Sequence, residues 1–211
     1  MNHKGVFITF EGGDGAGKTT LIEKLFADLN ERSLDVMKTR APGGTPLGQE
    51  VRSLLLEKRE IPLSKRAELL LFLSDRAQHV DEVISPALES QKIVLCDRFN
   101  DSTIAYQGGA RGFGEEIVRS FCRFASNALV PDLTLYLDLD PSIGFERTKN
   151  SRSSQDRIES EALHFHNQIR SAFHHIAKTE PKRFILLDAS LPPEEVFRNA
   201  KEKIDALLDR K

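Results

Sequence analysis

Residues 5–20 read GVFITFEGGDGAGKTT, an apolar run followed directly by a glycine-rich segment. The first seven of these residues are rich in β-branched and aromatic side chains, which predicts a short buried strand. Leucines then recur at every fourth position from Leu21 to Leu29, and this spacing predicts a helix over residues 17–30. A strand, a glycine-rich turn and a helix in direct succession are typical of the first crossover in an α/β domain.

The glycine-rich turn fits the pattern G-x-x-x-x-G-K-[ST] from Gly12 to Thr19. Backbone N–H groups can surround a phosphate only where side chains do not obstruct the approach, and the helix that follows adds its positive end. The lysine can reach the β- and γ-phosphates, and the threonine hydroxyl can bind Mg²⁺. A turn without a ligand is the alternative, but the strand and helix around the motif favour ATP. The residues assigned to ATP here are Gly12, Gly13, Asp14, Gly15, Ala16, Gly17, Lys18, Thr19 and Thr20.

The rest of the chain alternates between apolar runs and helical patterns. Further strands are predicted at residues 34–39, 92–96, 133–138 and 183–187. Helices are predicted at 47–56, 64–90 and 140–148, from about 157, after a glycine-rich loop at 108–114, and at the end of the chain near 208. The expected fold is therefore one α/β domain over residues 1–211, with a doubly wound five-stranded parallel sheet flanked by helices. Ligands bind such sheets at the carboxyl ends of the strands.

The composition limits the possible functions. The net charge is −2, so no overall field attracts nucleic acid or a membrane surface. No apolar run near the start is long enough for a membrane span or a signal peptide. Cys96 and Cys122 have no CxxC partner, and we expect both to be buried and reduced, as in a cytoplasmic protein. The six histidines have no metal-ligand spacing and are expected to lie scattered on the surface.

Charged residues follow the predicted second and third strands. Asp97 and Arg98 end the third strand, where the carboxylate can hold Mg²⁺ and the guanidinium can bind a phosphate with two parallel hydrogen bonds. Arg40 follows the second strand and can reach the same phosphate. A surface ion pair is the alternative for Asp97 and Arg98. Together with the glycine-rich turn, these residues indicate a kinase with a second pocket for a phosphate acceptor.

Phe72 and Arg76 lie four residues apart and share one face of a predicted helix. A ring that stacks on a base, one turn from a hydrogen-bond donor, could read a nucleobase. Phe72 belongs to the run LLLFL, however, so its spacing alone favours a place in the hydrophobic core.

Five motifs in one order resemble the thymidylate kinases, P-loop enzymes that phosphorylate dTMP. These motifs are FEGGDGAGKTT at 10–20, TRAPGGT at 39–45, LFLSDRAQHV at 71–80, DRFNDSTIAYQGGARG at 97–112 and DRIES at 156–160. The resemblance implies a P-loop NTPase fold with a mobile lid at about residues 147–157. It also implies ATP and dTMP as substrates, Mg²⁺ as cofactor, and a homodimer formed through regions 64–90 and 114–127.

The resemblance assigns roles in the dTMP pocket. Phe72 would stack on thymine, and Arg76 would hydrogen-bond the base. For Phe72 the resemblance therefore favours the binding pocket over the hydrophobic core that its spacing alone favoured. Thr103 would contact the edge of the ring, and Gln107 would lie beside the base. Tyr106 would lie against the sugar where a ribose 2′-OH would be.

The resemblance also assigns roles around the phosphates. Arg40 and Arg98 would bind the dTMP phosphate, and Asp97 would belong to the magnesium site. An acid that faced the ATP phosphates would repel them. Asp14 should therefore not face them, and the resemblance implies that it turns to the acceptor and accepts a hydrogen bond from the dTMP 3′-OH.

The lid carries the cations Arg147, Lys149, Arg152 and Arg157. One branch of the family has an arginine in the phosphate loop, where this chain has Gly15. The chain therefore resembles the bacterial-type branch, in which a lid arginine stabilises the transferring phosphoryl group. We expect Arg152 to do this, with Arg147 as the second choice. Adenine is expected near Asp188 and Ala189.

Two other functions remain open at this stage. A related kinase would use UMP, CMP or shikimate as acceptor, although the order of the motifs argues against it. A nucleotide-dependent switch without catalysis is a third hypothesis, but the guanine-reading motif NKxD is absent from the sequence.

Overall fold

A computed structural model describes residues 5–149 and 156–210 of the chain. The sheet has five parallel strands in the order β2-β3-β1-β4-β5. The strands are β1 (Val6–Gly12), β2 (Val36–Arg40), β3 (Ile93–Asp97), β4 (Leu133–Asp138) and β5 (Phe184–Asp188). The predicted parallel sheet is therefore confirmed. β1 lies at its centre, between β3 and β4, so the glycine-rich turn emerges where the strand order reverses.

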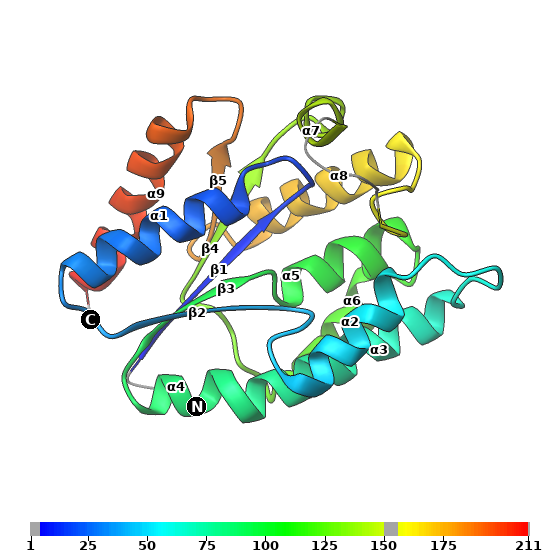
Figure 1. Ribbon diagram of the computed structural model, residues 1–211, viewed down its shortest axis with the longest axis horizontal. Coiled ribbons are helices and arrows are strands. Elements are labelled where there is room, and N and C mark those ends of the chain that lie inside the picture. The colour runs from blue at the N-terminus through cyan, green and yellow to red at the C-terminus, as the bar shows by residue number, and fades with distance from the viewer. Residues whose placement is uncertain (1–4, 150–155, 211) are drawn as a thin grey trace.

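Helices cover both faces of the sheet, as a doubly wound fold requires (Figure 1). The α-helices are α1 (Lys18–Glu31), α2 (Pro46–Leu56), α3 (Lys65–His79), α4 (Ser85–Glu89), α5 (Asn100–Thr103), α6 (Glu115–Ala125), α7 (Pro141–Lys149), α8 (Leu163–Thr179) and α9 (Pro193–Leu208). The described residues also form two π-helical segments, η1 (Val80–Ile84) and η2 (Ile104–Ala110). The predicted helix at 64–90 is thus α3, η1 and α4 in continuous succession.

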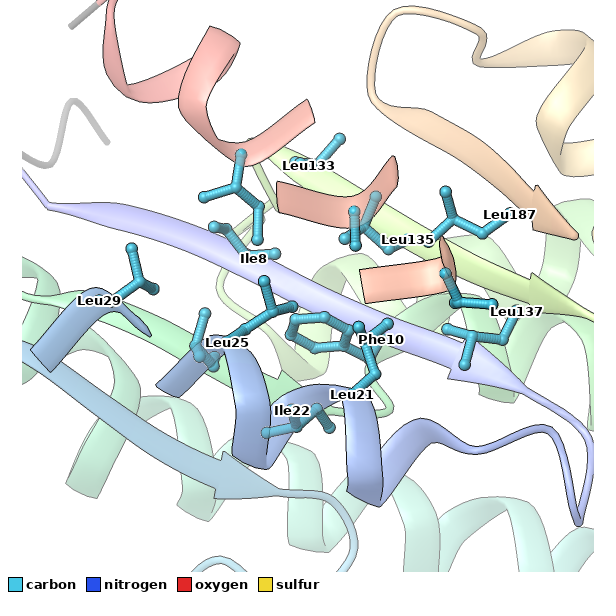
Figure 2. Close-up of a cluster of buried hydrophobic side chains, with 14 of the residues drawn as sticks. Ile8, Phe10, Leu21, Ile22, Leu25, Leu29, Leu133, Leu135, Leu137 and Leu187 are labelled. Atoms are coloured by element: carbon cyan, nitrogen blue, oxygen red, sulfur yellow. The ribbon is translucent and has the colours of Figure 1, made fainter. Parts of the chain in front are cut away.

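One face of the sheet packs on α1 and α9. Ile8 and Phe10 alternate with the residues that point to the opposite face, and they meet Leu21 and Leu25 of α1 in the largest buried cluster (Figure 2). Leu135 of β4 joins the same cluster. This packing fixes the position of α1, which begins directly after the glycine-rich turn. The amino end of α1 therefore points toward the site where the turn would bind a ligand.

The opposite face packs on α6, α8 and η2 beside β4 and β5, and on η1 and α4 beside β1 and β3. Tyr136 of β4 stacks on Phe173 of α8, with ring centroids 4.5 Å apart. Cys96 and Cys122 are buried and free, as expected. His79 and His166 are also buried, so the prediction of surface histidines is wrong for these two. His79 lies in the α3 interface, where its Nε2 is 2.7 Å from the Thr39 hydroxyl.

Two predicted boundaries need correction. The predicted loop at 108–114 begins inside η2, because Gly108 and Gly109 serve close packing: a Cβ on Gly109 would lie 3.0 Å from the Cβ of Ala172 in α8. The predicted helix from about 157 begins instead at Leu163. Before it lies a turn whose N–H groups at 158 and 159 donate to the carboxylate of Asp156.

Candidate active site

The turn between β1 and α1 has the backbone geometry of a phosphate-binding loop. Gly15 and Gly17 have φ angles of 72° and 91°, in the left-handed region that favours glycine. Lys18 folds back over the loop, where its Nζ donates to the carbonyls of Gly12 (3.0 Å) and Gly13 (3.1 Å). Burial lowers the pKa of this ammonium, and the nearby Arg98 lowers it further. The cation is therefore held by two neutral carbonyl groups.

Helix α7 packs directly on this loop. A Cβ on Gly15 would lie 2.5 Å from the carbonyl oxygen of Gly144, so no side chain fits at either glycine without moving the backbone. Arg147, one turn further along α7, donates to the carbonyl of Ala189 at 3.0 Å and weakly to that of Gly15 at 3.4 Å. One arginine thus joins α7, the phosphate-binding loop and the segment after β5.

A cavity of about 660 Å³ opens beside the loop, at the carboxyl ends of the strands. This volume is typical of a site for a small organic ligand. Many of the residues predicted for the site line it, and these are Asp14, Lys18, Thr19, Arg40, Phe72, Arg76, Asp97, Arg98, Thr103, Tyr106 and Gln107. The structure therefore brings together side chains that are up to 93 positions apart in the sequence, from Asp14 to Gln107.

Other predicted residues lie elsewhere. Asp188 is exposed at the end of β5, does not line the cavity, and accepts hydrogen bonds from the N–H (2.9 Å) and hydroxyl (2.6 Å) of Ser190. Thr20 is exposed on α1, also away from the cavity. Arg147 lies at the phosphate-binding loop as described above. Arg152 lies outside the described residues, and so does most of the predicted lid.

Arg98 occupies the centre of the site in a strained backbone conformation. Its φ angle is 67°, a left-handed value that is unfavourable for a residue with a Cβ and that is concentrated at functional sites. Its guanidinium donates to the hydroxyl of Ser102 (3.1 Å) and lies 5.4 Å from the centre of the Tyr106 ring. The surrounding structure thus orients the guanidinium before any ligand arrives.

Glu11 of β1 lies close to Arg98, and no motif in the sequence pointed to it. Its fully buried carboxyl accepts hydrogen bonds from the N–H groups of Phe99 (2.8 Å) and Ser102 (3.2 Å) and from the Ser102 hydroxyl (2.5 Å). Burial raises its pKa to about 7, although the nearby Arg98 opposes this change. The signal in the sequence was an acid in an otherwise apolar central strand.

Arg76 lines the cavity where α3 borders it, with 3% of its surface exposed. Its guanidinium carbon is 4.2 Å from the centre of the Phe99 ring. Its Nε and Nη1 atoms are buried, and neither has a hydrogen-bond partner within the described part of the chain. Buried guanidinium donors are costly unless an acceptor meets them, so this end of the cavity is suited to a ligand oxygen. Phe72 lines the cavity on the same helix face and belongs to none of the buried hydrophobic clusters found among the described residues.

The part of the cavity wall formed by α2 and the ends of β2 and β3 carries further cations. Arg52 of α2, which the sequence analysis did not consider, donates to the carbonyl of Pro42 at 3.1 Å. Burial lowers its pKa, and the neighbouring charge of Arg40 lowers it further. The signal for Arg52 was helical spacing, because it lies one turn from the buried Gly48. Arg40, Arg52 and Arg98 give this wall the positive charge that a phosphate group requires.

Asp97 and Thr19 supply oxygen atoms to the same cavity. Asp97 Oδ1 is buried and has no hydrogen-bond partner within residues 5–149 and 156–210. Within the same ranges, no group of three or more His, Cys, Asp or Glu side chains is arranged to hold a metal ion. A cation here would therefore need ligands from a bound nucleotide, which is the usual environment of Mg²⁺.

The fold and the phosphate-binding loop are those of a P-loop kinase. The sequence model for thymidylate kinase matches residues 10–200. The chain is 49% identical to the thymidylate kinase of Desulfovibrio desulfuricans over 98% of both chains, and 47% identical to that of Halothermothrix orenii over 97% of this chain and 99% of the relative. The chain belongs to the thymidylate kinase family, whose members are ATP-dependent nucleoside monophosphate kinases.

A solved structure shows the same fold. The crystal structure of thymidylate kinase from Ehrlichia chaffeensis matches this chain with a TM-score of 0.77 and 33% identity, over 95% of this chain and 98% of that one. The prediction of a P-loop NTPase fold is thereby confirmed. No helix in the described ranges is long and apolar enough to cross a membrane.

Proposed function

We propose that this protein transfers the γ-phosphoryl group of ATP to dTMP, which gives dTDP and ADP for dTTP synthesis. The observation that carries the proposal is the single cavity that runs from the phosphate-binding loop to the unpaired donors of Arg76. Membership of the thymidylate kinase family supports it and does not favour UMP or CMP as acceptor. The dTMP phosphate is already an anionic nucleophile near neutral pH, so the reaction needs positioning and charge neutralisation more than a strong base.

The thymine base would occupy the end of the cavity at α3. Phe72 offers a ring face for stacking, and Arg76 offers two unpaired donors for a base carbonyl. Thr103 and Gln107 line the same end and would contact the edge of the ring. Burial raises the pKa of Tyr106 to about 12, so its hydroxyl stays neutral beside the sugar. Its ring would occupy the space that a ribose 2′-OH needs, which favours deoxynucleotides.

The phosphates would meet between the loop and the cationic wall. Arg40 and Arg98 would hold the dTMP phosphate, and Arg52 would join them because it lines the same wall. Residues 12–20 would hold the ATP phosphates, with Lys18 moving from its present carbonyl partners to the β- and γ-phosphates.

Mg²⁺ fits the oxygen atoms between these groups. Thr19 and Asp97 would hold it, because both residues line the cavity and Oδ1 of Asp97 has no hydrogen-bond partner among the described residues. The ion would neutralise charge that develops on the transferring phosphoryl group.

The remaining contacts with ATP would come from segments beside the phosphate-binding loop. Adenine would lie near Asp188 and Ala189, and Arg147 supports that position because it already binds the Ala189 carbonyl. Arg152 would complete the charge neutralisation from the lid. This assignment rests on the family resemblance and on Gly15, whose contact with Gly144 leaves no room for an arginine in the loop.

The chain is further proposed to act as a single cytoplasmic domain that forms a homodimer. α3 packs beside α6, and together they expose the apolar side chains Leu70, Ile117, Phe121 and Phe124, with Phe124 89% exposed. Such a patch is unusual on a monomer. Analytical sedimentation tests this arrangement. A wild type that sediments as a dimer and a Phe124→Glu variant that sediments as a monomer would support it. A wild type that sediments as a monomer would exclude it.

The reaction itself is tested with ATP labelled in its γ-phosphate. Incubation with dTMP should move the label into dTDP, because the acceptor phosphate is proposed to bind in the cavity beside the phosphate-binding loop. Label that appears only as free phosphate would mean hydrolysis without an acceptor, and the proposed transfer would be wrong.

A further inference from the structure

The carboxylate of Glu68 accepts hydrogen bonds from three side chains outside its own helix. It lies in the first turn of α3 with 2% of its surface exposed. Gln107 donates through Nε2 at 3.0 Å, and Arg111 donates through Nε at 3.0 Å and Nη2 at 3.2 Å. Arg157 donates through Nη2 at 2.6 Å. One carboxylate therefore joins α3, the cavity wall in η2 and the turn before α8.

This carboxylate is ionised in the folded protein. Burial alone would raise the pKa of Glu68, but the hydrogen bonds from Arg111 and Gln107 outweigh it and hold the pKa below its usual range. The amino end of α3 adds a favourable dipole at the same place. Glu68 thus presents only acceptor atoms at neutral pH.

An acceptor-only partner determines which way the Gln107 amide faces. A carboxylate can accept from the NH₂ group of glutamine but cannot bond its oxygen, so Nε2 must face Glu68. The oxygen Oε1 is then turned away from Glu68. It accepts no hydrogen bond from the residues that the structure describes, and Gln107 lines the cavity.

The cavity wall consequently presents one fixed acceptor from Gln107 and the unpaired donors of Arg76. Thymine offers a matching edge, with a donor at N3–H and acceptors at its carbonyl oxygens. Cytosine offers an acceptor at N3 and a donor at its amino group. A free glutamine amide could rotate to suit cytosine, whereas one held by a carboxylate cannot.

We propose that Glu68 is a positioning residue that determines base specificity, because it holds the Gln107 amide with its oxygen toward the base. The inference rests on the proposed function, since it takes thymine as the base at this end of the cavity. Arg111 and Arg157 fix the carboxylate from its other sides, so Glu68 cannot turn toward a different partner when Gln107 moves.

The test compares dissociation constants for dTMP and dCMP, measured by competition, in wild type and Glu68→Gln. A glutamine at 68 can donate as well as accept, so the amide of Gln107 becomes free to turn over. The preference for dTMP over dCMP should fall about tenfold, the value of one hydrogen bond of ordinary strength. Glu161→Gln is the matched control, because Glu161 binds Arg111 at 2.6 Å and makes no hydrogen bond or ion pair with Gln107 in the described ranges. It should leave the preference unchanged.

Two further variants keep the test decisive if Glu68→Gln does not fold. Glu68→Asp keeps the charge but withdraws it from Gln107, and it should also reduce the preference. Gln107→Leu should reduce the preference by the same factor, and adding a change at residue 68 should reduce it no further. Equal losses of dTMP and dCMP affinity at Glu68, or an unchanged preference in Gln107→Leu, would overturn the proposal. Wild-type turnover of dTMP is measured separately, so failure of the proposed function would be recognised independently.

Discussion

Asp14 Oδ1 lies 3.9 Å from Nη2 of Arg98, so the acid of the phosphate-binding loop faces the arginine that follows β3. The two residues belong to different strand ends, and their side chains are both largely buried. That Asp14 turns away from the ATP phosphates stays a prediction. The ion pair joins the phosphate-binding loop to the residue that follows β3.

If Asp14 contacts dTMP as proposed, Asp14→Ala should weaken the binding of dTMP far more than the binding of ATP. One hydrogen bond to a charged group is worth about 1.5–3 kcal/mol, so KM for dTMP should rise about 10- to 100-fold while KM for ATP changes little. Steady-state kinetics with each substrate varied in turn provide the measurement. Asp35→Ala is the control, since its exposed carboxylate pairs with Lys92 away from the cavity. Equal losses for both substrates would place Asp14 elsewhere.

Lys18→Ala should abolish nearly all turnover and leave the fold intact. The present partners of its ammonium are two carbonyls of its own loop, whose loss costs little stability. The role of the cation lies with the transferring phosphates, so kcat should fall about 10²–10³-fold. Coupled ADP release and thermal unfolding provide the two measurements. Lys24→Ala on the same helix is the control, because that lysine pairs with exposed Glu194. Turnover near the wild-type rate in Lys18→Ala would contradict the assignment.

Arg147 and Arg152 should have separable effects. Arg147 already binds the Ala189 carbonyl at 3.0 Å, so Arg147→Ala should mainly raise KM for ATP. Arg152→Ala should instead lower kcat about 10²–10³-fold, as expected for an arginine that stabilises the transferring phosphoryl group. Rapid-quench measurement of the chemical step distinguishes the two. An unchanged kcat in Arg152→Ala would move the role to another cation.

The stability of the protein should depend on Glu11 between pH 4.5 and 7. Burial raises the pKa of Glu11 from its ordinary value of 4.5 to about 7, so the folded protein keeps a proton that the unfolded chain has released. The resulting stabilisation is fully present below pH 4.5 and is lost as the pH rises through about 7. The free energy of unfolding of wild type, relative to Glu11→Gln, should therefore fall by about 3 kcal/mol across this range. Urea unfolding at a series of pH values measures it.

Glu23→Gln is the control for that series, because its exposed carboxylate pairs with Lys38 on the surface. Its difference from wild type should show no comparable trend over the same pH range. A wild-type stability that rises from pH 4.5 to 7 relative to Glu11→Gln would mean that Arg98 outweighs burial and that Glu11 is ionised throughout.

Local patterns predicted the strands and the phosphate-binding loop, because parallel strands are continuous apolar runs and the loop motif is contiguous. The family motifs predicted the residues that line the cavity. Long-range contacts could not be read in this way. Glu11 and Glu68 are acids whose importance depends on donors from distant segments, Ser102 in one case and Arg157 in the other. His79 was predicted to lie on the surface, because the sequence around it does not indicate that β2 packs against it.

Coupled ADP release with dTMP, dUMP, UMP, CMP and dCMP as acceptors tests the central claim most directly. We predict that kcat/KM is highest for dTMP. UMP should not be phosphorylated, because the ring of Tyr106 is proposed to lie where its 2′-OH would be. CMP and dCMP should not be phosphorylated either, because their base does not match the hydrogen-bonding groups of Arg76 and Gln107. A clear preference for UMP or CMP over dTMP would contradict it.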